Sequence, residues 1–79
     1  MSVTDPLRIF VTGATGYIGG SVAAALISRG HHVRGLARSP QAAKQLETMS
    51  VDPVLGSLDD ADVLLAEADG ADVVINAAS

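Results

Sequence analysis

Three glycines between a predicted strand and a predicted helix constrain this 79-residue chain more than any other feature. Residues 7–12 (LRIFVT) are rich in branched and aromatic side chains, as buried strands are, and Gly13, Gly16 and Gly19 follow at once. The first glycine allows a sharp turn, the second lets a pyrophosphate approach the backbone, and the third lets the helix pack close to the sheet. The first helical turn then presents N–H groups and the positive end of its dipole to an anion.

A tight turn between any strand and any helix can contain glycine for conformational reasons alone. The fixed spacing of the three glycines at the junction of a strand-helix-strand unit instead favours a site for a dinucleotide phosphate. The sequence therefore predicts an anion-binding turn over residues 12–19.

Strand and helix patterns alternate after this turn. Apolar residues at helical spacing predict a helix over residues 17–29, which Gly30 ends. A strand pattern over residues 32–37 precedes a helix that Ser39 caps and that begins at Pro40. The inner faces predicted for these two helices consist of Ile18, Val22, Ala25 and Leu26, and of Ala42, Leu46 and Met49.

The last part of the chain repeats the alternation with weaker signals. A brief strand is expected at residues 53–55, and a helix follows in which Asp59 or Asp60 is the cap and Gly70 the terminator. A fourth strand is expected at residues 72–77. The residues predicted to share one face of this third helix are Ala61, Leu64, Leu65 and Ala68.

Regular alternation of strands and helices predicts an α/β fold with a doubly wound parallel sheet of the Rossmann type, which here stops after about four strands. A complete dinucleotide fold has two mononucleotide halves, and this chain supplies one half and an additional strand. We therefore expect residues 1–79 to be the N-terminal part of a single NAD(P)-binding Rossmann domain.

Composition and charge exclude several classes of protein. The formal net charge of −4 and the lack of a basic stripe argue against nucleic acid and anionic membranes as partners. No apolar run approaches the ~18 residues of a membrane span. The chain has no cysteine, which excludes disulfides and thiolate metal sites, and a cytoplasmic protein is the expectation.

Four segments, TGATGYIGG, ARSP, GSLDD and NAAS, together resemble the extended or atypical short-chain dehydrogenase/reductase family, whose members include NAD(P)-dependent epimerases and dehydratases. The likeness covers nearly the whole chain. It implies that the pyrophosphate of a dinucleotide is held by the glycines of the turn and that the residues between them line the loop. These residues are Gly13, Gly16 and Gly19, with Thr15, Tyr17 and Ile18.

The end of the second strand favours NADP over NAD. Relatives that prefer NAD carry an acidic residue where this chain has Ala37, and the next residue, Arg38, offers a planar cation suited to a 2′-phosphate. Thr15 could add a hydroxyl contact to that phosphate. Alternatively, Arg38 is a solvated surface residue. Arg34 could reinforce the site, although a side chain pointing to solvent is the stronger expectation.

The resemblance also implies contacts to adenine and the riboses. The family pattern Gly-Asp-Leu after the third strand reads Gly-Ser-Leu here, so Ser57 can offer a hydrogen bond but no carboxylate, and Leu58 keeps an apolar contact. After the fourth strand, small residues let the backbone pass near the cofactor, which the likeness assigns to Ala77 and Ala78. For Asn76, contact and simple packing are equally good readings.

No catalytic residue is expected in this segment. Members of the family use a Tyr-x-x-x-Lys pair for proton exchange. The single tyrosine is Tyr17, the single lysine is Lys44, and Ser21 stands four residues after the tyrosine. His31 and His32 suit a solvated turn better than a metal site.

The sequence therefore predicts an NADP(H)-binding segment of an oxidoreductase, epimerase or dehydratase, incomplete for catalysis and dependent on a further part for its small-molecule substrate. A second hypothesis is a non-catalytic module that senses NADP, and a third is a nucleotide-free scaffold. An exposed sheet edge makes a homodimer plausible.

Overall fold

The computed structural model describes residues 6–14, 16–57 and 59–77, and its strands and helices follow the predicted order. The strand over residues 32–37 has the predicted bounds, and the other predicted boundaries differ from the observed ones by at most about one residue, as helix and strand ends commonly do. The elements are β1 (Arg8–Thr12), α1 (Tyr17–Ser28), β2 (His32–Ala37), α2 (Pro40–Thr48), β3 (Asp52–Leu55), α3 (Ala61–Gly70) and β4 (Val73–Asn76).

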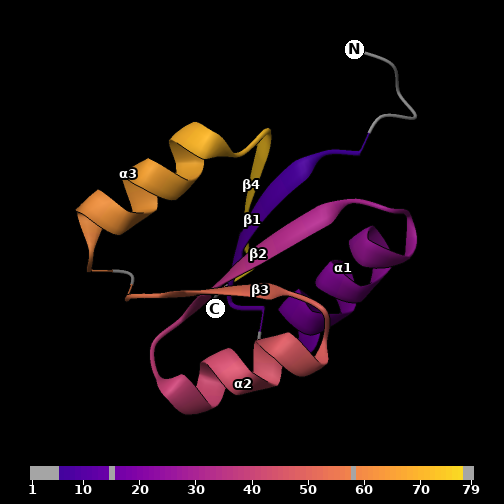
Figure 1. The fold of residues 1–79 in the computed structure, drawn as a ribbon, viewed down its shortest axis with the longest axis horizontal. Helices are drawn as coiled ribbons and strands as arrows, with labels where there is room; N and C mark the ends of the chain where they lie inside the picture. Colours follow the sequence, from indigo (N-terminus) through magenta and orange to yellow (C-terminus); the bar gives the residue numbers. More distant parts are fainter. Residues whose placement is uncertain (1–5, 15, 58, 78–79) are drawn as a thin grey trace.

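All pairings in the sheet are parallel, and the strand order is β3-β2-β1-β4. The chain steps outward from β1 through β2 to β3, and then returns past both strands to place β4 on the other side of β1. Helices α1 and α2 lie on one face of the sheet and α3 lies on the other (Figure 1). The predicted α/β fold with a doubly wound parallel sheet is therefore confirmed.

The helix signals of the first half act as the sequence predicts. Gly30 adopts a φ of 86° directly after α1. The hydroxyl of Ser39 accepts a hydrogen bond of 3.1 Å from the amide of Ala42, and Pro40 occupies the first turn of α2. Helix α2 ends in a turn in which Ser50 takes a φ of 62°, where the amide of Val51 donates to Leu46.

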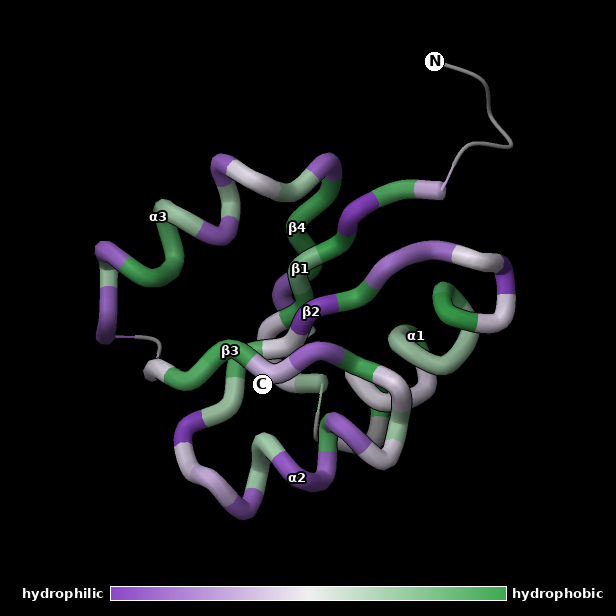
Figure 2. Tube along the Cα trace, viewed as in Figure 1, coloured by the Kyte–Doolittle hydropathy of each residue, from purple (hydrophilic) through white to green (hydrophobic). Residues whose placement is uncertain are grey.

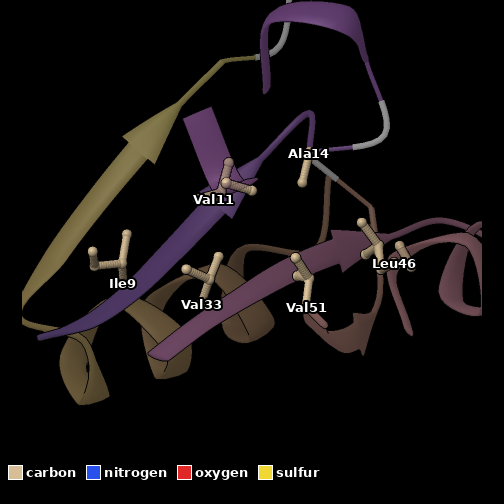
Figure 3. Close-up of a cluster of buried hydrophobic side chains, with 8 residues drawn as sticks. Ile9, Val11, Ala14, Val33, Leu46 and Val51 are labelled. Atoms are coloured by element: carbon tan, nitrogen blue, oxygen red, sulfur yellow. The ribbon is translucent and has the colours of Figure 1, made fainter. Parts of the chain in front are cut away.

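The main core lies between the sheet and the pair α1 and α2. It comprises the buried residues Ile9, Val11, Ala14, Ala23, Val33, Ala37, Leu46 and Val51. Figure 3 shows labelled members of this cluster, among them residues from β1, β2, the turn after β1 and α2, gathered in one layer. In Figure 2 the hydrophobic colours run along β1 and β4 in the middle of the molecule. Phe10 alternates with Ile9 and Val11 and is buried on the opposite face.

Helix α1 buries a different face from the one its periodicity predicts. Ala23 is fully buried, whereas Ile18 is 68% exposed and Ala25 is also exposed. The reason is that Gly19, not Ile18, faces the glycine turn and brings the helix against it. Leu26 is partly buried against the core as predicted.

The predictions for α3 are correct only in part. Asp60 stands at the N-cap position, but its side chain makes no capping hydrogen bond, because its carboxylate bonds the amide of Ser57 instead. Gly70 is the last residue of the helix, and the cap is Ala71 in an extended conformation. On the predicted inner face, Leu65 is 69% exposed, and α3 contains no buried residue among those described.

Candidate functional site

The glycine turn after β1 has a geometry that only glycine permits. Gly13 adopts a φ of 80°, and its carbonyl accepts a hydrogen bond of 3.0 Å from the amide of Gly16. A Cβ placed on Gly19 would lie 2.0 Å from the same carbonyl oxygen, far inside van der Waals contact. The third glycine therefore lets the first turn of α1 rest directly on the backbone of the loop.

Helix α1 begins at a residue that offers no side-chain cap. Its N-cap is Gly16, in an extended conformation and without a side-chain cap, and Gly16 accepts the first helical bond from Gly20 at 2.8 Å. The N–H groups of the first turn of a helix have no partner within the helix, and the dipole makes this end positive. The turn thus combines an open approach with donors and a favourable potential for an anion.

The carboxyl ends of all four strands gather at this edge of the sheet, since the strands are parallel. The strand order reverses between β1 and β4, and ligands of open α/β sheets bind at such a point. The residues predicted at the ends of β2, β3 and β4, which are Arg38, Ser57 and Ala77, lie along the same edge as the glycine turn.

At the end of β2, Ala37 and Arg38 have opposite environments. Ala37 is 1% exposed and belongs to the main core, and its carbonyl accepts a 2.9 Å hydrogen bond from Gly56. Arg38 is exposed. The strand thus ends with a small buried residue followed by a cation that solvent and ligand can reach.

A compact loop follows β3. The amide of Ser57 donates to Oδ2 of Asp60 at 2.9 Å, and the hydroxyl of Ser57 accepts from the amide of Asp59 at 3.2 Å. Gly56 leaves room for the returning carboxylate, because a Cβ there would be 3.3 Å from the same Oδ2. The sequence predicts a helix cap at Asp59 or Asp60, and no local pattern indicates the bond between Asp60 and Ser57.

The ends of β1 and β4 are joined by side chain and backbone. Oγ1 of Thr12, itself 5% exposed, donates to Oδ1 of Asn76 at 2.7 Å, and the amide of Ala77 donates to the carbonyl of Thr12 at 2.9 Å. Ala77 is half-buried and lies next to the turn. Packing and hydrogen bonding thus account for the position of Asn76.

Several predicted residues cannot be located as predicted. Thr15, Leu58 and Ala78 lie outside the described residues, and for Tyr17 only the backbone at the start of α1 is described. In the described ranges, Gly13, Gly16, Gly19 and exposed Ile18 come together at the turn.

A family model described as "NmrA-like family" matches residues 6–79. The chain belongs to the NmrA-like family. The resemblance to dehydrogenases and reductases is also confirmed by the relatives of this NmrA-like chain. It is 40% identical over 73 residues (92% of the chain) to the 4-hydroxy-2-methyl-3-oxo-4-farnesyl-3,4-dihydroquinoline-1-oxide ketoreductase of Stigmatella aurantiaca. It is 38% identical over 82 residues (99% of the chain) to the 3 beta-hydroxysteroid dehydrogenase/Delta 5-->4-isomerase of Mycobacterium tuberculosis.

Solved structures agree with the fold. The structure of AtPrR2 with NADP+ and (+)pinoresinol superposes with a TM-score of 0.80 at 26% identity and covers 95% of this chain and 27% of that chain. A putative exported protein from Burkholderia pseudomallei gives a TM-score of 0.73 at 37% identity over 92% of this chain and 32% of its own. The NmrA-like chain spans 22% of the length of the ketoreductase and 21% of that of the dehydrogenase.

A pocket of this NmrA-like chain lies at the other end of the sheet, among the described residues. This pocket, of about 410 Å³, separates α3 from the amino ends of β1, β2 and β3. Its walls include Phe10 and Ala66, and Nη1 of Arg34 is 3.1 Å from Oε1 of Glu67 at its rim. Arg34 therefore bridges β2 to α3 and does not reinforce the glycine turn.

Of the two histidines predicted in a solvated turn, His32 is exposed as predicted and His31 is not. Nδ1 of His31 accepts a 3.0 Å hydrogen bond from the amide of Leu7, so half-buried His31 ties the turn after α1 to the start of β1. His32 lines the pocket. In the described part of the chain, no group of three His, Asp or Glu side chains could hold a metal ion, and no helix is long and apolar enough to cross a membrane.

Proposed function

We propose that this chain binds NADP(H), as the first part of a single Rossmann domain in an oxidoreductase or an epimerase or dehydratase. The observation that carries the proposal is the contact between Gly19 and the carbonyl of Gly13, because a Cβ at Gly19 would come within 2.0 Å of that oxygen. A turn that needs glycine only to reverse direction does not require this approach of helix to loop.

The pyrophosphate would lie against the amides at the start of α1. Gly13, Gly16 and Gly19 keep side chains out of the approach, and Ile18, 68% exposed, would flank it. Thr15 and Tyr17 complete the proposed lining. When bound, NADPH would supply the hydride that a reductase transfers, and the residues of this chain would bind and orient the nucleotide.

The preference for NADP rests on the end of β2. Ala37 is buried and uncharged, so the acid that would hold the ribose hydroxyls of NAD is missing. Arg38 is exposed at the same edge, where its guanidinium can pair with a 2′-phosphate in two parallel hydrogen bonds. Both features favour the phosphorylated nucleotide.

The other end of the nucleotide would run along the ends of β3 and β4. We assign adenine contacts to Ser57 and Leu58, and contacts near the riboses to Ala77 and Ala78. The hydroxyl of Ser57 already accepts from the amide of Asp59, so toward adenine it can act only as a donor or through its remaining lone pair.

Two functions of the whole protein remain to be separated. The relatives are a ketoreductase and a dehydrogenase/isomerase, which supports an oxidoreductase whose substrate is bound by a further part of the protein. A non-catalytic NADP sensor would use the same turn. Replacing the tyrosine of a Tyr-x-x-x-Lys pair elsewhere in the protein distinguishes them, because an oxidoreductase loses turnover and keeps NADPH affinity.

Titration with NADPH and NADH tests the binding proposal directly. We expect NADPH to bind at least about tenfold more tightly, a difference of about 1.4 kcal/mol, and Arg38→Asp to abolish the preference. Arg29→Asp is the matched control, because Arg29 is exposed at the opposite end of α1. Equal affinities of the unmodified protein for the two nucleotides would refute the NADP assignment.

We also propose a cytoplasmic location, supported by the lack of cysteine, and, for the 79-residue chain by itself, a homodimer formed through β4. Of the two edge strands, β3 contains Pro53, which has no N–H to donate, whereas β4 exposes Val73 and Val74. Size-exclusion chromatography with Val74→Lys tests the dimer: the variant should elute as a monomer.

A further inference from the structure

Ala14, the residue after the first glycine of the turn, is fully buried and is surrounded by glycines. A Cβ on Gly20 would lie 3.3 Å from the carbonyl oxygen of Ala14, and a Cβ on Gly35 would lie 3.4 Å from its Cβ. On the third side, a Cβ on Gly19 would lie 3.1 Å from the Cα of Ala14. We call this arrangement of Gly19, Gly20 and Gly35 the Ala14 socket.

Gly20 lies inside α1, where glycine disfavours the helix relative to alanine. The added methyl of an alanine would press on a backbone carbonyl, which cannot rotate away as a side chain can, and would approach Cε of Met49 to 3.4 Å. The absence of a side chain at Gly20 therefore leaves room for the carbonyl group of Ala14.

Gly35 limits the socket from the sheet. It lies in β2 beside Val11 of β1, and a Cβ there would come within 3.0 Å of Cδ1 of Leu46 and of Cγ1 of Val51. Both side chains are almost completely buried, and Figure 3 shows them on the same side of the sheet as Ala14. Because these side chains are closely packed, they have little room to move. A methyl group added at Gly35 would therefore push against Ala14 and displace the glycine turn.

We propose that Gly20 and Gly35 are positioning residues for the nucleotide, which act through Ala14 and fix the height of the glycine turn above the sheet. Neither touches the ligand in this arrangement. Their lack of side chains lets Ala14 seat fully, and the amides of the turn then keep the spacing that a diphosphate needs. This inference rests on the proposed nucleotide-binding function.

Gly20→Ala is the decisive variant. In the free variant, the glycine turn would shift to relieve the contact between the added methyl group and the carbonyl of Ala14. Because NADPH binding must move the turn back, its affinity should fall by about tenfold. A purely structural role of Gly20 predicts the opposite result, a lower thermal midpoint with unchanged NADPH affinity. We expect the thermal midpoint not to fall, because alanine favours a helix over glycine. Gly70→Ala is the matched control: Gly70 is also helical, and a Cβ there meets nothing within 4 Å.

Gly35→Ala approaches the socket from the other side and gives an independent test. It should also weaken NADPH binding several-fold. The fold-loss of NADPH affinity in the double variant should differ from the product of the two single losses, because both methyl groups act on Ala14. In the nucleotide-free protein, the ¹⁵N–¹H shifts of Gly13, Gly16 and Gly19 should move in both variants and stay in place in Gly70→Ala.

Unchanged NADPH affinity in folded Gly20→Ala and Gly35→Ala overturns the inference, as do strictly independent losses or an equal loss in Gly70→Ala. If the unmodified protein itself does not bind NADPH, the proposed function fails. The shifts of the free protein then still decide whether the glycines position the turn: unmoved shifts overturn that part as well.

Discussion

The two faces of the sheet are covered to very different degrees. On the α1 and α2 face, Val11, Ala14 and Leu46 have no exposed surface at all. On the other face, α3 buries none of its described residues completely, and a pocket of about 410 Å³ remains between it and the strands. Figure 1 shows the same contrast in the ribbon, where α1 and α2 flank the sheet together and α3 stands alone.

This contrast separates two requirements on one sheet. The glycine turn is built on the closely packed face, because donors that hold an anion need fixed positions. On the α3 side, Arg34 of β2 pairs with Glu67 of α3, and Arg8 of β1 pairs with Asp72, which follows α3. Precise packing is therefore concentrated where a ligand would sit.

The largest expected difference is in the cost of truncating a leucine on each face. Leu46→Ala removes a fully buried side chain of α2 and should lower the free energy of unfolding by about 2–5 kcal/mol. Leu65→Ala in α3 should change it by less than about 0.5 kcal/mol, since Leu65 is 69% exposed. Urea unfolding followed by circular dichroism measures both, and similar losses would contradict the contrast between the faces.

A methyl group at Gly19 should be the most damaging single change to the turn. Its Cβ would overlap the carbonyl of Gly13 at 2.0 Å, so α1 must move away from the loop, and NADPH affinity should fall about hundredfold. Isothermal titration calorimetry measures the loss. Gly70→Ala should bind NADPH as the unmodified protein does, and a Gly19→Ala variant that does the same would break the link between close packing and binding.

A smaller effect is expected from the ion pair that anchors α3. Because Arg34 is 54% exposed, Glu67→Gln should cost only about 0.2–1 kcal/mol, and the loss should appear locally. Hydrogen exchange of α3 amides should speed up, while that of α1 and α2 amides stays unchanged. Asp69→Asn, an exposed acid of the same helix, is the control. Faster exchange in all three helices would mean that the faces unfold as one unit.

The smallest effect should be a pH dependence at the edge between β1 and β4. The amide of Arg8 donates to the Asp72 carboxylate at 2.9 Å and, together with the nearby guanidinium, lowers the pKa of Asp72 below its usual 3.8. A lowered pKa stabilises the fold above that value, and the gain is lost as the pH falls through the folded pKa. Asp72→Asn should flatten the acid end of a stability profile, whereas Asp69→Asn should leave it as steep as before.

The order of the elements could be predicted because local residues determine it. Gly13, Gly30 and Ser39 mark turns and caps through their own backbone or side chain, and the structure places each at the expected junction. Parallel pairing follows from the alternation of strands and helices. The glycine turn itself was predictable for the same reason, since the contacts described in it join residues that lie within one short segment, Gly13 to Gly19.

Contacts between distant segments could not be predicted in this way. His31 accepts from Leu7, 24 residues away, and Arg34 meets Glu67 only because α3 returns over β2. The socket role of Gly35 depends on Leu46 and Val51, which no local pattern places beside it. A glycine inside a strand does signal close approach of other atoms, and it was the one clue available.

The central position of β1 has a consequence for synthesis on the ribosome. One edge of β1 pairs with β2 soon after the turn, but the other must wait for β4, whose link from Asp72 to Arg8 spans 64 residues. At about 5–20 residues per second, that edge stays unpaired for roughly 3–13 seconds. Phe10 lies on this strand. The nascent chain therefore exposes unpaired backbone groups and an aromatic side chain for long enough that a chaperone can bind them.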